Sequence, residues 1–443
     1  MDSHDQSRRN FGLLKRLHLE ILYQVIYTLP NADIKNLRPT CSYLGNISLQ
    51  RFNRVFISPN PLDIEVLTLI ANHDVFRLEV TEIIYDDSRF DHLLRRRAAY
   101  NSMLRGIDAK EGENDYIPHV KEAFKTRCTM RESWEVHGKL KSQQDEVLAS
   151  GRDADALRYD LLGDYSLTPW DETSKQEWRG FCVVTKEIAQ HIRENPMFGL
   201  SEFVAEGRQS WIGINCHMLD NPASEEYRDL VTILSHPPLR RLELSFACGE
   251  ESKHDWPSFR SGHLFRALSK ATNLQDLRFD TRIPLQHRIW HQFVEYAQNG
   301  MPLQSMFAIS AFSNIRRLAL SRSFVRQKDD MAFISTLPSS LESLGLNFLS
   351  FLPCEGTYRD LLQDMRCNLG WRDRPAGNRP KLIVLVVENE SLIDGAAMDV
   401  SHAAMDYVYH HKENPFVEDQ ILEVLEGKGT SVDLLDPMHG EEL

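Results

Sequence analysis

The sequence lacks the features that mark several large classes of protein. Its longest stretch without a charge lies between Glu295 and Arg316 and contains Gln, Asn, Ser, Gly and Pro, so it does not predict a membrane span. The first ten residues are polar and charged, and no apolar segment follows them, so we expect no secretory signal. The net charge of −13 argues against nucleic acid as the main partner, because phosphate binding requires a basic surface. We therefore expect a protein of the cytoplasm, the nucleus or both, with neither membrane nor nucleic acid as partner.

Cysteine is scarce and scattered. The chain has 7 cysteines, an odd number, and no Cys-x-x-Cys pair. This pattern predicts neither a disulfide framework nor a zinc site of ordinary spacing, and it favours a reducing compartment. We accordingly predict no metal and no cofactor.

Catalytic motifs are absent as well. The sequence has no phosphate-binding GxxxxGK[ST], no GxGxxG after a predicted strand, no GxSxG and no HExxH. Asp86 and Asp87, with Asp91 nearby, end a predicted strand and could bind a metal, but such clusters more often solvate a turn. We expect no catalytic residue, and an enzyme that uses Asp86 and Asp87 stays open as an alternative.

The first segment with a regular apolar pattern is a short amphipathic unit near the N-terminus. Apolar residues recur at every fourth position from Leu17 to Leu29, which predicts one apolar face of a helix ended by Pro30. Asp33 is the expected N-cap of a second short helix. Pro39 removes a backbone donor and disfavours helix at Arg38, so this second helix should be cut short.

The next segment predicts a strand, a helix and a second strand. Residues 55–57 read as a strand, a Ser-Pro-Asn-Pro turn follows, residues 62–70 read as a helix, and residues 80–85 as a strand. A helix followed by a strand of this pattern is typical of one repeat of a solenoid. Residues 93–225 carry mixed charges and apolar positions at helical spacing, which predicts a mostly helical insertion.

A repeated LxxLxL frame dominates the C-terminal half, with helical segments between its copies. Strand, loop, helix and strand in this order are expected of leucine-rich repeats at the long and irregular end of their length range. The predicted fold class is therefore α/β, with a short N-terminal helical module, an irregular repeat-like solenoid and a helical insertion. The five copies are LRRLEL (239–244), LQDLRF (274–279), IRRLAL (315–320), LESLGL (341–346) and LIVLVV (382–387).

The predicted division of the chain follows from these patterns. It comprises a disordered lead (1–12), a helical module (13–55), a first repeat-like unit (56–92), the insertion (93–225), the main repeat array (226–425) and a mobile acidic tail (426–443).

The polar positions of the LxxLxL frame are the candidate binding residues. In this frame the leucines point into the core, and the residues between them point outward, stacked one strand spacing apart. A target protein would meet charges on the first three copies. The candidate target-binding residues are Arg241, Glu243, Asp276, Arg278 and Arg317.

The opening unit resembles an F-box, the short helical module that docks on a Skp-family adaptor of cullin-based ubiquitin ligases. Residues 54–90 are similar to the segment that follows the F-box in fungal F-box proteins with degenerate leucine-rich repeats. The two matches together cover about residues 14–92. The F-box pattern falls on Leu17, Glu20, Ile21, Leu22, Val25, Leu29, Asp33, Ile34, Leu37 and Cys41.

This resemblance implies a function, partners and a docking site. The chain would be a non-catalytic, substrate-recognition subunit of a cullin-based ubiquitin ligase, with a Skp adaptor, a cullin and an unknown protein target as partners. The open alternative is an F-box-like repeat scaffold or regulator that acts outside a ubiquitin ligase. The adaptor-binding residues implied are Leu17, Glu20, Ile21, Leu22, Val25, Leu29, Ile34 and Leu37.

Overall fold

A computed structural model describes most of the chain, which divides into two compact units. The first unit comprises residues 1–55 and 68–80, and the second comprises residues 56–67 and 81–443. The predicted lead (1–12), residues 87–92 of the predicted first repeat-like unit and residues 93–168 of the predicted insertion lie outside the described residues. The described residues are 18–58, 61–86, 169–172, 175, 179–206, 213–249, 251–281, 299–387, 396–410, 412–416 and 430–433.

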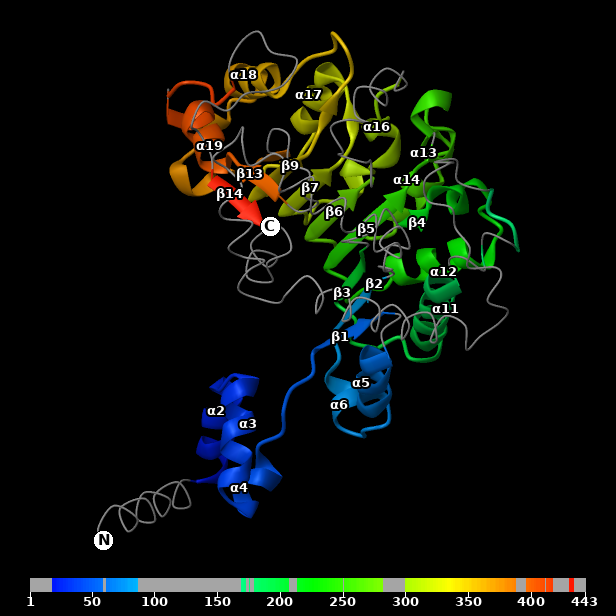
Figure 1. Ribbon diagram of the computed structural model, residues 1–443, viewed down its shortest axis with the longest axis vertical. Helices are drawn as coiled ribbons and strands as arrows, with labels where there is room; N and C mark the ends of the chain where they lie inside the picture. The colour runs from blue at the N-terminus through cyan, green and yellow to red at the C-terminus, as the bar shows by residue number, and fades with distance from the viewer. Residues whose placement is uncertain are drawn as a thin grey trace, which may run out of the picture. The chain divides into compact units, whose positions relative to one another are not determined.

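Three short helices and one 3-10 turn form the start of the first unit (Figure 1). Their core consists of four buried side chains, Leu22, Ile26, Ile34 and Leu44, with half-buried apolar neighbours around them. A core of this size is small for a segment of about 40 residues, which usually needs a partner to be stable. The elements are α2 (Leu19–Thr28), α3 (Asn31–Leu37), η1 (Arg38–Thr40) and α4 (Ser42–Ile47); α5 (Pro61–Ala71) and α6 (Phe76–Glu79) follow.

Asn31 and Arg51 fix the turn between α2 and α3. The Asn31 side chain donates to the Arg51 carbonyl at 2.6 Å and accepts from the Arg51 backbone N–H at 2.9 Å. The Arg51 guanidinium donates to the carbonyl oxygens of Tyr27 and Leu29, which belong to the last turn of α2. These contacts satisfy carbonyl groups that a helix end leaves without partners.

Two of the helix-end predictions can be judged. The stop at Pro30 is confirmed, since α2 ends at Thr28, and α3 ends at Leu37 before the 3-10 turn that contains Pro39. The prediction of Asp33 as N-cap is wrong, because Pro30 already takes the extended cap conformation and α3 begins two residues earlier. Asp33 instead places its charge in the first turn of α3, where the helix dipole favours an acidic side chain.

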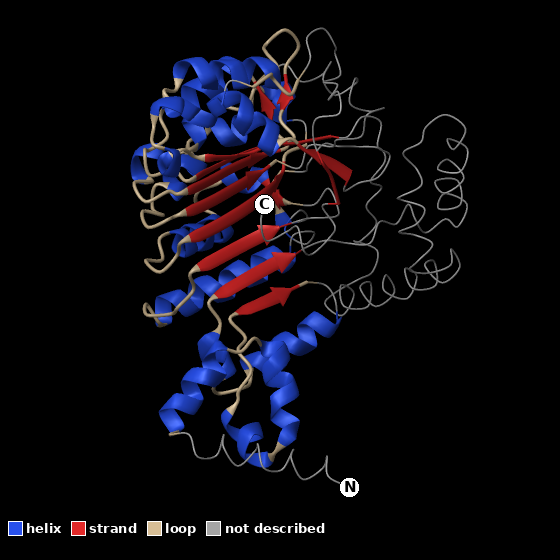
Figure 2. Ribbon diagram, turned by 90° about the vertical axis from the view of Figure 1, so that its left-hand side faces the viewer, coloured by secondary structure: helices blue, strands red, loops and turns tan. Residues whose placement is uncertain are grey.

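A mostly parallel sheet organises the second unit, and the mixed α/β class is confirmed (Figure 2). The strands predicted at residues 55–57, at residues 80–85 and at the first four LxxLxL segments are present. Neighbouring strands in the sheet follow chain order, which is β1-β2-β3-β5-β6-β7-β9-β11. Their bounds are β1 (Arg54–Ile57), β2 (Glu82–Asp86), β3 (Glu202–Glu206), β5 (Arg241–Ala247), β6 (Asp276–Asp280), β7 (Arg317–Ser321), β9 (Ser343–Asn347) and β11 (Lys381–Ile383).

From β2 to β11, one apolar residue of each strand in this order lies in register with its neighbours across the sheet. Because a slip of one residue would turn every side chain to the other face, burial of this row fixes the register. The row runs Ile83, Phe203, Leu242, Leu277, Leu318, Leu344 and Leu382.

Helices fill the connections between successive strands, and Figure 1 shows them along the outer side of the sheet. Their apolar side chains and the inward row of the strands form one continuous core. The helices are α11 (Arg179–Glu194), α12 (Glu225–Leu234), α13 (Pro257–Arg260), α14 (His263–Leu268), α16 (Leu303–Met306), α17 (Gln327–Ser335), α18 (Tyr358–Asn368) and α19 (Ser401–His410).

Phenylalanine rings pass through this core from one connection to the next. Phe279 of β6 is the centre of the chain of contacts. Its ring centroid lies 5.5 Å from that of Phe246, 6.1 Å from Phe259 and 5.3 Å from Phe307. Phe307 in turn lies 5.5 Å from Phe333 of α17. All five rings are buried, so they join strands and helices of several successive connections.

One short ladder extends the main sheet, and another forms a separate two-stranded sheet. Strand β4 (Ile214–Asn215) pairs in parallel with the C-terminal end of β5, and β8 (Phe324–Val325) pairs in parallel with β10 (Ser350–Phe351). A separate antiparallel sheet contains β12 (Leu385–Val387), β13 (Ala396–Asp399) and β14 (Thr430–Asp433).

Three predicted boundaries are corrected. The insertion does not extend to residue 225, because β3 at 202–206 is a full member of the main sheet between β2 and β5. The segment LIVLVV is not one strand: β11 pairs with β9, and β12 turns to the antiparallel sheet. Residues 430–433 of the predicted mobile tail form β14, whose backbone pairs with β13. Among the helices of the described residues, none is both long and apolar enough to cross a membrane.

Candidate functional site

Helix α2 turns one side to the core and leaves apolar side chains on both flanks. Leu22 and Ile26 are buried, whereas Ile21 and Val25 remain 48% and 42% exposed. Residues three or four apart share one side of a helix, so Ile21 and Val25 form one exposed pair. The other flank carries Leu19, Tyr23 and Tyr27, which are 45%, 48% and 76% exposed.

Half of the ten residues of this helix are apolar side chains exposed to solvent. A protein that acts as a monomer rarely leaves so many apolar side chains on one helix in contact with water. Exposed apolar patches mark protein interaction sites, and α2 carries one on each flank, the Ile21–Val25 pair and the set of Leu19, Tyr23 and Tyr27. We call these five side chains, taken over both flanks of α2, the docking face.

The structure separates the predicted adaptor-binding residues into two groups. Ile21 and Val25 lie on the docking face, and the Glu20 side chain is exposed on the same helix, where it contacts the His18 ring. Leu22 and Ile34 are instead core residues, so their prediction as direct contacts is corrected. Each hydrophobic residue type fits both roles, and only the helix's rotation about its axis distinguishes them. Leu29 and Leu37 are half-buried and pack on the same core, and Leu17 lies outside the described residues.

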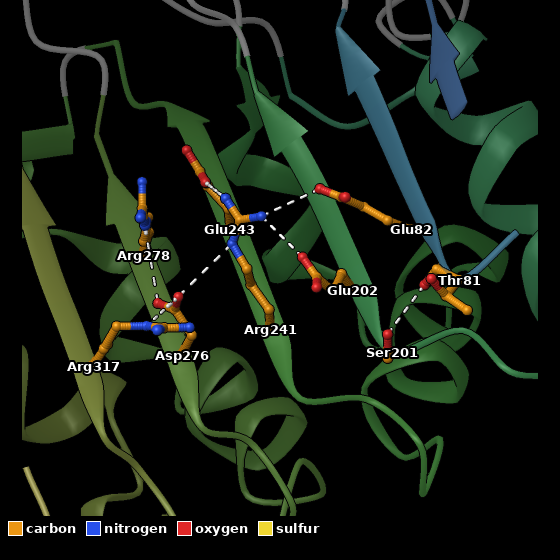
Figure 3. Close-up of polar contacts among 9 residues, drawn as sticks. All are labelled: Thr81, Glu82, Ser201, Glu202, Arg241, Glu243, Asp276, Arg278 and Arg317. Carbon is orange, nitrogen blue, oxygen red and sulfur yellow. Dashed lines mark hydrogen bonds and ion pairs between the residues drawn. The ribbon is translucent and has the colours of Figure 1, made fainter. Parts of the chain in front are cut away.

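The second candidate site is an ion-pair network on one face of the main sheet (Figure 3). It brings together all five predicted target-binding residues: Arg241, Glu243, Asp276, Arg278 and Arg317. Parallel register explains the clustering, since Arg241 pairs with Asp276 and Asp276 with Arg317 in adjacent strands. Side chains opposite one another on neighbouring strands lie within contact distance.

Arg241 is the centre of this network. Its guanidinium lies 2.9 Å from a carboxylate oxygen of Glu202, 3.2 Å from Glu82, 3.3 Å from Glu243 and 3.8 Å from Asp276. The Arg241 side chain is 20% exposed, so one cation compensates several carboxylates in a largely dehydrated place. Glu82 and Glu202 were not among the predicted residues. Both could have been found from the sequence pattern, because each precedes the residue of its strand that belongs to the apolar row and therefore points outward.

Asp276 is the most deeply buried acid of the network. Its side chain is 4% exposed, and its carboxylate contacts Arg317 at 2.8 Å, Arg241 at 3.8 Å and Arg278 at 3.9 Å. Three arginines surround this carboxylate, so its charge is compensated within the sheet and Asp276 stabilises the network. Of the predicted target-binding residues, Arg317 is the most accessible, with a side chain 59% exposed.

A third group of reactive side chains lies at the junction of β4 and β5. Cys216, His217 and Glu251 each offer one potential metal-binding atom, and these atoms lie within 4.8 Å of one another. A hydrogen bond from the His217 ring to the Asp220 carboxylate raises the pKa of His217, and burial raises the pKa of the Glu251 carboxyl and of the Cys216 thiol. Of the other candidates, the Asp86 side chain and residues 87 and 91 lie outside the described residues.

A buried carboxyl group in α17 predicts how stability depends on pH. Asp330 is 2% exposed, and neither of its oxygens has a hydrogen-bond partner in the described part of the chain. Burial raises the pKa of Asp330 well above its ordinary value, so the folded protein retains a proton that the unfolded chain releases. Stability contributed by this proton is complete below the unfolded pKa and is lost as pH rises through the folded pKa.

We therefore expect Asp330→Asn to stabilise the protein at neutral pH by about 1–3 kcal/mol, because the amide cannot ionise. The gain should fall toward zero near pH 4. Urea unfolding of both proteins between pH 4 and pH 8 measures this difference. Asp373→Asn, which changes a carboxylate whose side chain is 81% exposed, is the matched control and should show no such pH-dependent gain. A gain from Asp330→Asn that is constant across this pH range would contradict the assignment.

Comparison with protein-family models, with curated proteins and with solved structures gives no match to this chain.

Proposed function

We propose that this chain is an F-box-type substrate-recognition subunit of a cullin-based ubiquitin ligase. The docking face of α2 would bind a Skp-family adaptor, and the second unit would hold a target protein. The single observation that carries the proposal is the docking face itself: five exposed apolar side chains on a helix whose core has only four buried residues. Amphipathic helices that lay apolar side chains into a partner's groove use this arrangement.

The second unit supports the role of target binding. Parallel strands in chain order, each followed by a helix and carrying one inward leucine or its equivalent, are what an irregular leucine-rich-repeat array requires. Such an array presents its strand faces as an extended binding surface. The subunit would contribute no catalytic residue, since holding a target beside the ligase is a proximity effect. Its place of action would be the cytoplasm, the nucleus or both.

Binding of the full chain to a purified Skp-family adaptor tests the proposal. We expect Ile21→Asp combined with Val25→Asp to weaken binding by about 100-fold or more, because two anchors at an interface centre are replaced by charges that must be dehydrated. Titration calorimetry measures the dissociation constant, and circular dichroism establishes that the variant is folded.

The matched control adds the same charges away from the docking face. Asn36→Asp combined with Asn46→Asp changes two exposed polar positions of α3 and α4 and should leave the dissociation constant within about threefold. A folded wild-type chain without adaptor affinity would refute the ligase role and favour a scaffold or regulator outside the ligase. Wild-type affinity of the double aspartate variant would refute the docking face.

A further inference from the structure

The pairing of β4 with β5 brings two distant cysteines together. Ile214 lies opposite Phe246 and Asn215 opposite Ala247, so the next position of the ladder sets Cys216 opposite Cys248. Neighbouring strands are about 4.8 Å apart. This register sets the two cysteines side by side on neighbouring strands, and both residues are buried.

Gly213 permits this close approach of β4. A Cβ atom at this position would lie 2.6 Å from the Ser245 carbonyl oxygen and 2.8 Å from the Ala247 nitrogen. Both contacts are shorter than real Cβ atoms allow, and backbone atoms of a central strand cannot move aside. The glycine therefore lets β4 pair with β5 and seat Cys216 against Cys248.

His217 and Glu251 complete a set of four potential ligands. His217 follows Cys216 directly, and its Nδ1 atom lies 3.8 Å from Oε1 of Glu251. Glu251 begins the turn after Cys248, and its side chain is 2% exposed. Asp220 accepts a hydrogen bond from the same Nδ1 atom at 2.9 Å, so a metal ion would bind the other ring nitrogen, Nε2, or displace this hydrogen bond.

Two hydrogen bonds from Ser258 orient the Glu251 carboxylate. The Ser258 hydroxyl donates to its Oε1 atom at 2.9 Å, and the Ser258 backbone N–H donates to Oε2 at 3.0 Å. Ligands oriented by such outer contacts are the rule in protein metal sites. The backbone of the same loop is fixed as well, because Trp256 donates from its N–H to the Glu251 carbonyl at 2.9 Å and from its indole to Asn299 at 2.8 Å.

We propose that these four side chains form a structural zinc site. Two thiolates and an imidazole are ligands that zinc prefers, and a carboxylate oxygen is an accepted fourth ligand. Zinc bonds of about 2.0–2.3 Å set tetrahedral ligand atoms about 3.3–3.8 Å apart. The ligand atoms of Cys216, His217 and Glu251 already lie within 4.8 Å of one another, so these three need movements of about 1 Å. The Cys248 thiol lies more than 4.8 Å from at least one of them and would have to turn further toward the site. The ligands are Cys216, His217, Cys248 and Glu251.

A site with four protein ligands has a structural role. It leaves no open position for a water molecule or a substrate, so it would bind the end of the β4–β5 ladder to the loop that contains Glu251. Binding replaces the thiol protons of Cys216 and Cys248, and the two thiolates and Glu251 offset the metal charge in a buried place. This inference does not depend on adaptor docking.

Elemental analysis of the purified full chain tests the site. After expression with added zinc and dialysis in reducing buffer, we expect one zinc per chain in the wild type. Cys216→Ser and Glu251→Gln should each lose most of it. Cys367→Ser, which changes an exposed cysteine, is the matched control and should keep one zinc per chain.

Cobalt substitution provides a readout that does not rely on the variants folding. Wild-type protein stripped by a chelator and loaded with Co²⁺ should show the visible spectrum of tetrahedral cobalt and a thiolate-to-metal charge-transfer band. In Cys248→Ser the charge-transfer band should fall to about half, as one of two thiolates is removed. Three outcomes would overturn the proposal: no retained zinc, equal zinc in wild type and Cys216→Ser, or a Cys216–Cys248 disulfide in the zinc-treated reduced protein by mass spectrometry.

Discussion

Replacing Arg241 by Met should destabilise the second unit by about 3 kcal/mol. Methionine keeps much of the side chain's apolar stem but removes the cation that contacts Glu82, Glu202, Glu243 and Asp276. Removing one partner of a buried ion pair is costly because the remaining charges lack compensation, and here several carboxylates share a single guanidinium. Urea denaturation, followed by circular dichroism, measures the change in the free energy of unfolding.

An exposed ion pair provides the matched control for Arg241. Arg316 contacts Glu342 at 2.9 Å, but both side chains are more than half exposed, at 57% and 58%. Arg316→Met should therefore cost less than about 1 kcal/mol. If Arg241→Met proves as mild as Arg316→Met, the network would not stabilise the sheet, and its charges would be available for target binding.

The part of the fold that could be predicted from the sequence is the part set by local apolar spacing. Each LxxLxL segment places its fourth residue in the same inward row, and Leu242, Leu277 and Leu318 lie in register across adjacent strands. Burial of this row fixes both the strands and their order in the sheet. The same spacing also indicated the outward positions, so the members of the ion-pair network on β5, β6 and β7 were found in advance.

The strands that were missed depend on contacts distant in the chain. In β3 the inward residues are Phe203 and Ala205, and leucine is absent from both positions, so the repeated frame is not visible. Strand β14 exists because its backbone pairs with β13, and that pairing does not need an apolar pattern in residues 430–433. Long-range pairing is where sequence patterns carry the least information.

The docking face and the proposed zinc site also depend on contacts that the local sequence does not reveal. On α2 the pattern identified a helix with too many apolar residues, but Ile21 and Leu22 are equally apolar and adjacent, so only packing against Ile34 and Leu44 shows which one is buried. The cysteine pair has no local signal either. Cys216 and Cys248 are far apart in sequence and meet only through the register of β4 with β5. A rule based on Cys-x-x-Cys spacing cannot detect such a site.

Phe279→Ala should cost about 3–5 kcal/mol, the usual penalty for emptying the place of a fully buried aromatic ring. Phe279 is 1% exposed and contacts the rings of Phe246, Phe259 and Phe307, which come from both neighbouring connections. Its removal leaves a cavity that these rings cannot fill without leaving their own positions. The free energy of unfolding from urea denaturation checks the magnitude, and Phe265→Ala, at a ring 37% exposed on α14, should cost far less.

The location of the Phe279 effect is as informative as its size. In an array where each repeat touches only its neighbours, stability is the sum of the repeats and of the interfaces between them. A cavity at β6 weakens the interfaces on both of its sides, because Phe246 belongs to β5 and Phe307 precedes β7. Amide hydrogen exchange should therefore speed up in β5, β6 and β7 together and change little in β11, the third strand beyond β6 in the sheet order. Uniform acceleration through β11 would show instead that the sheet unfolds as one cooperative block.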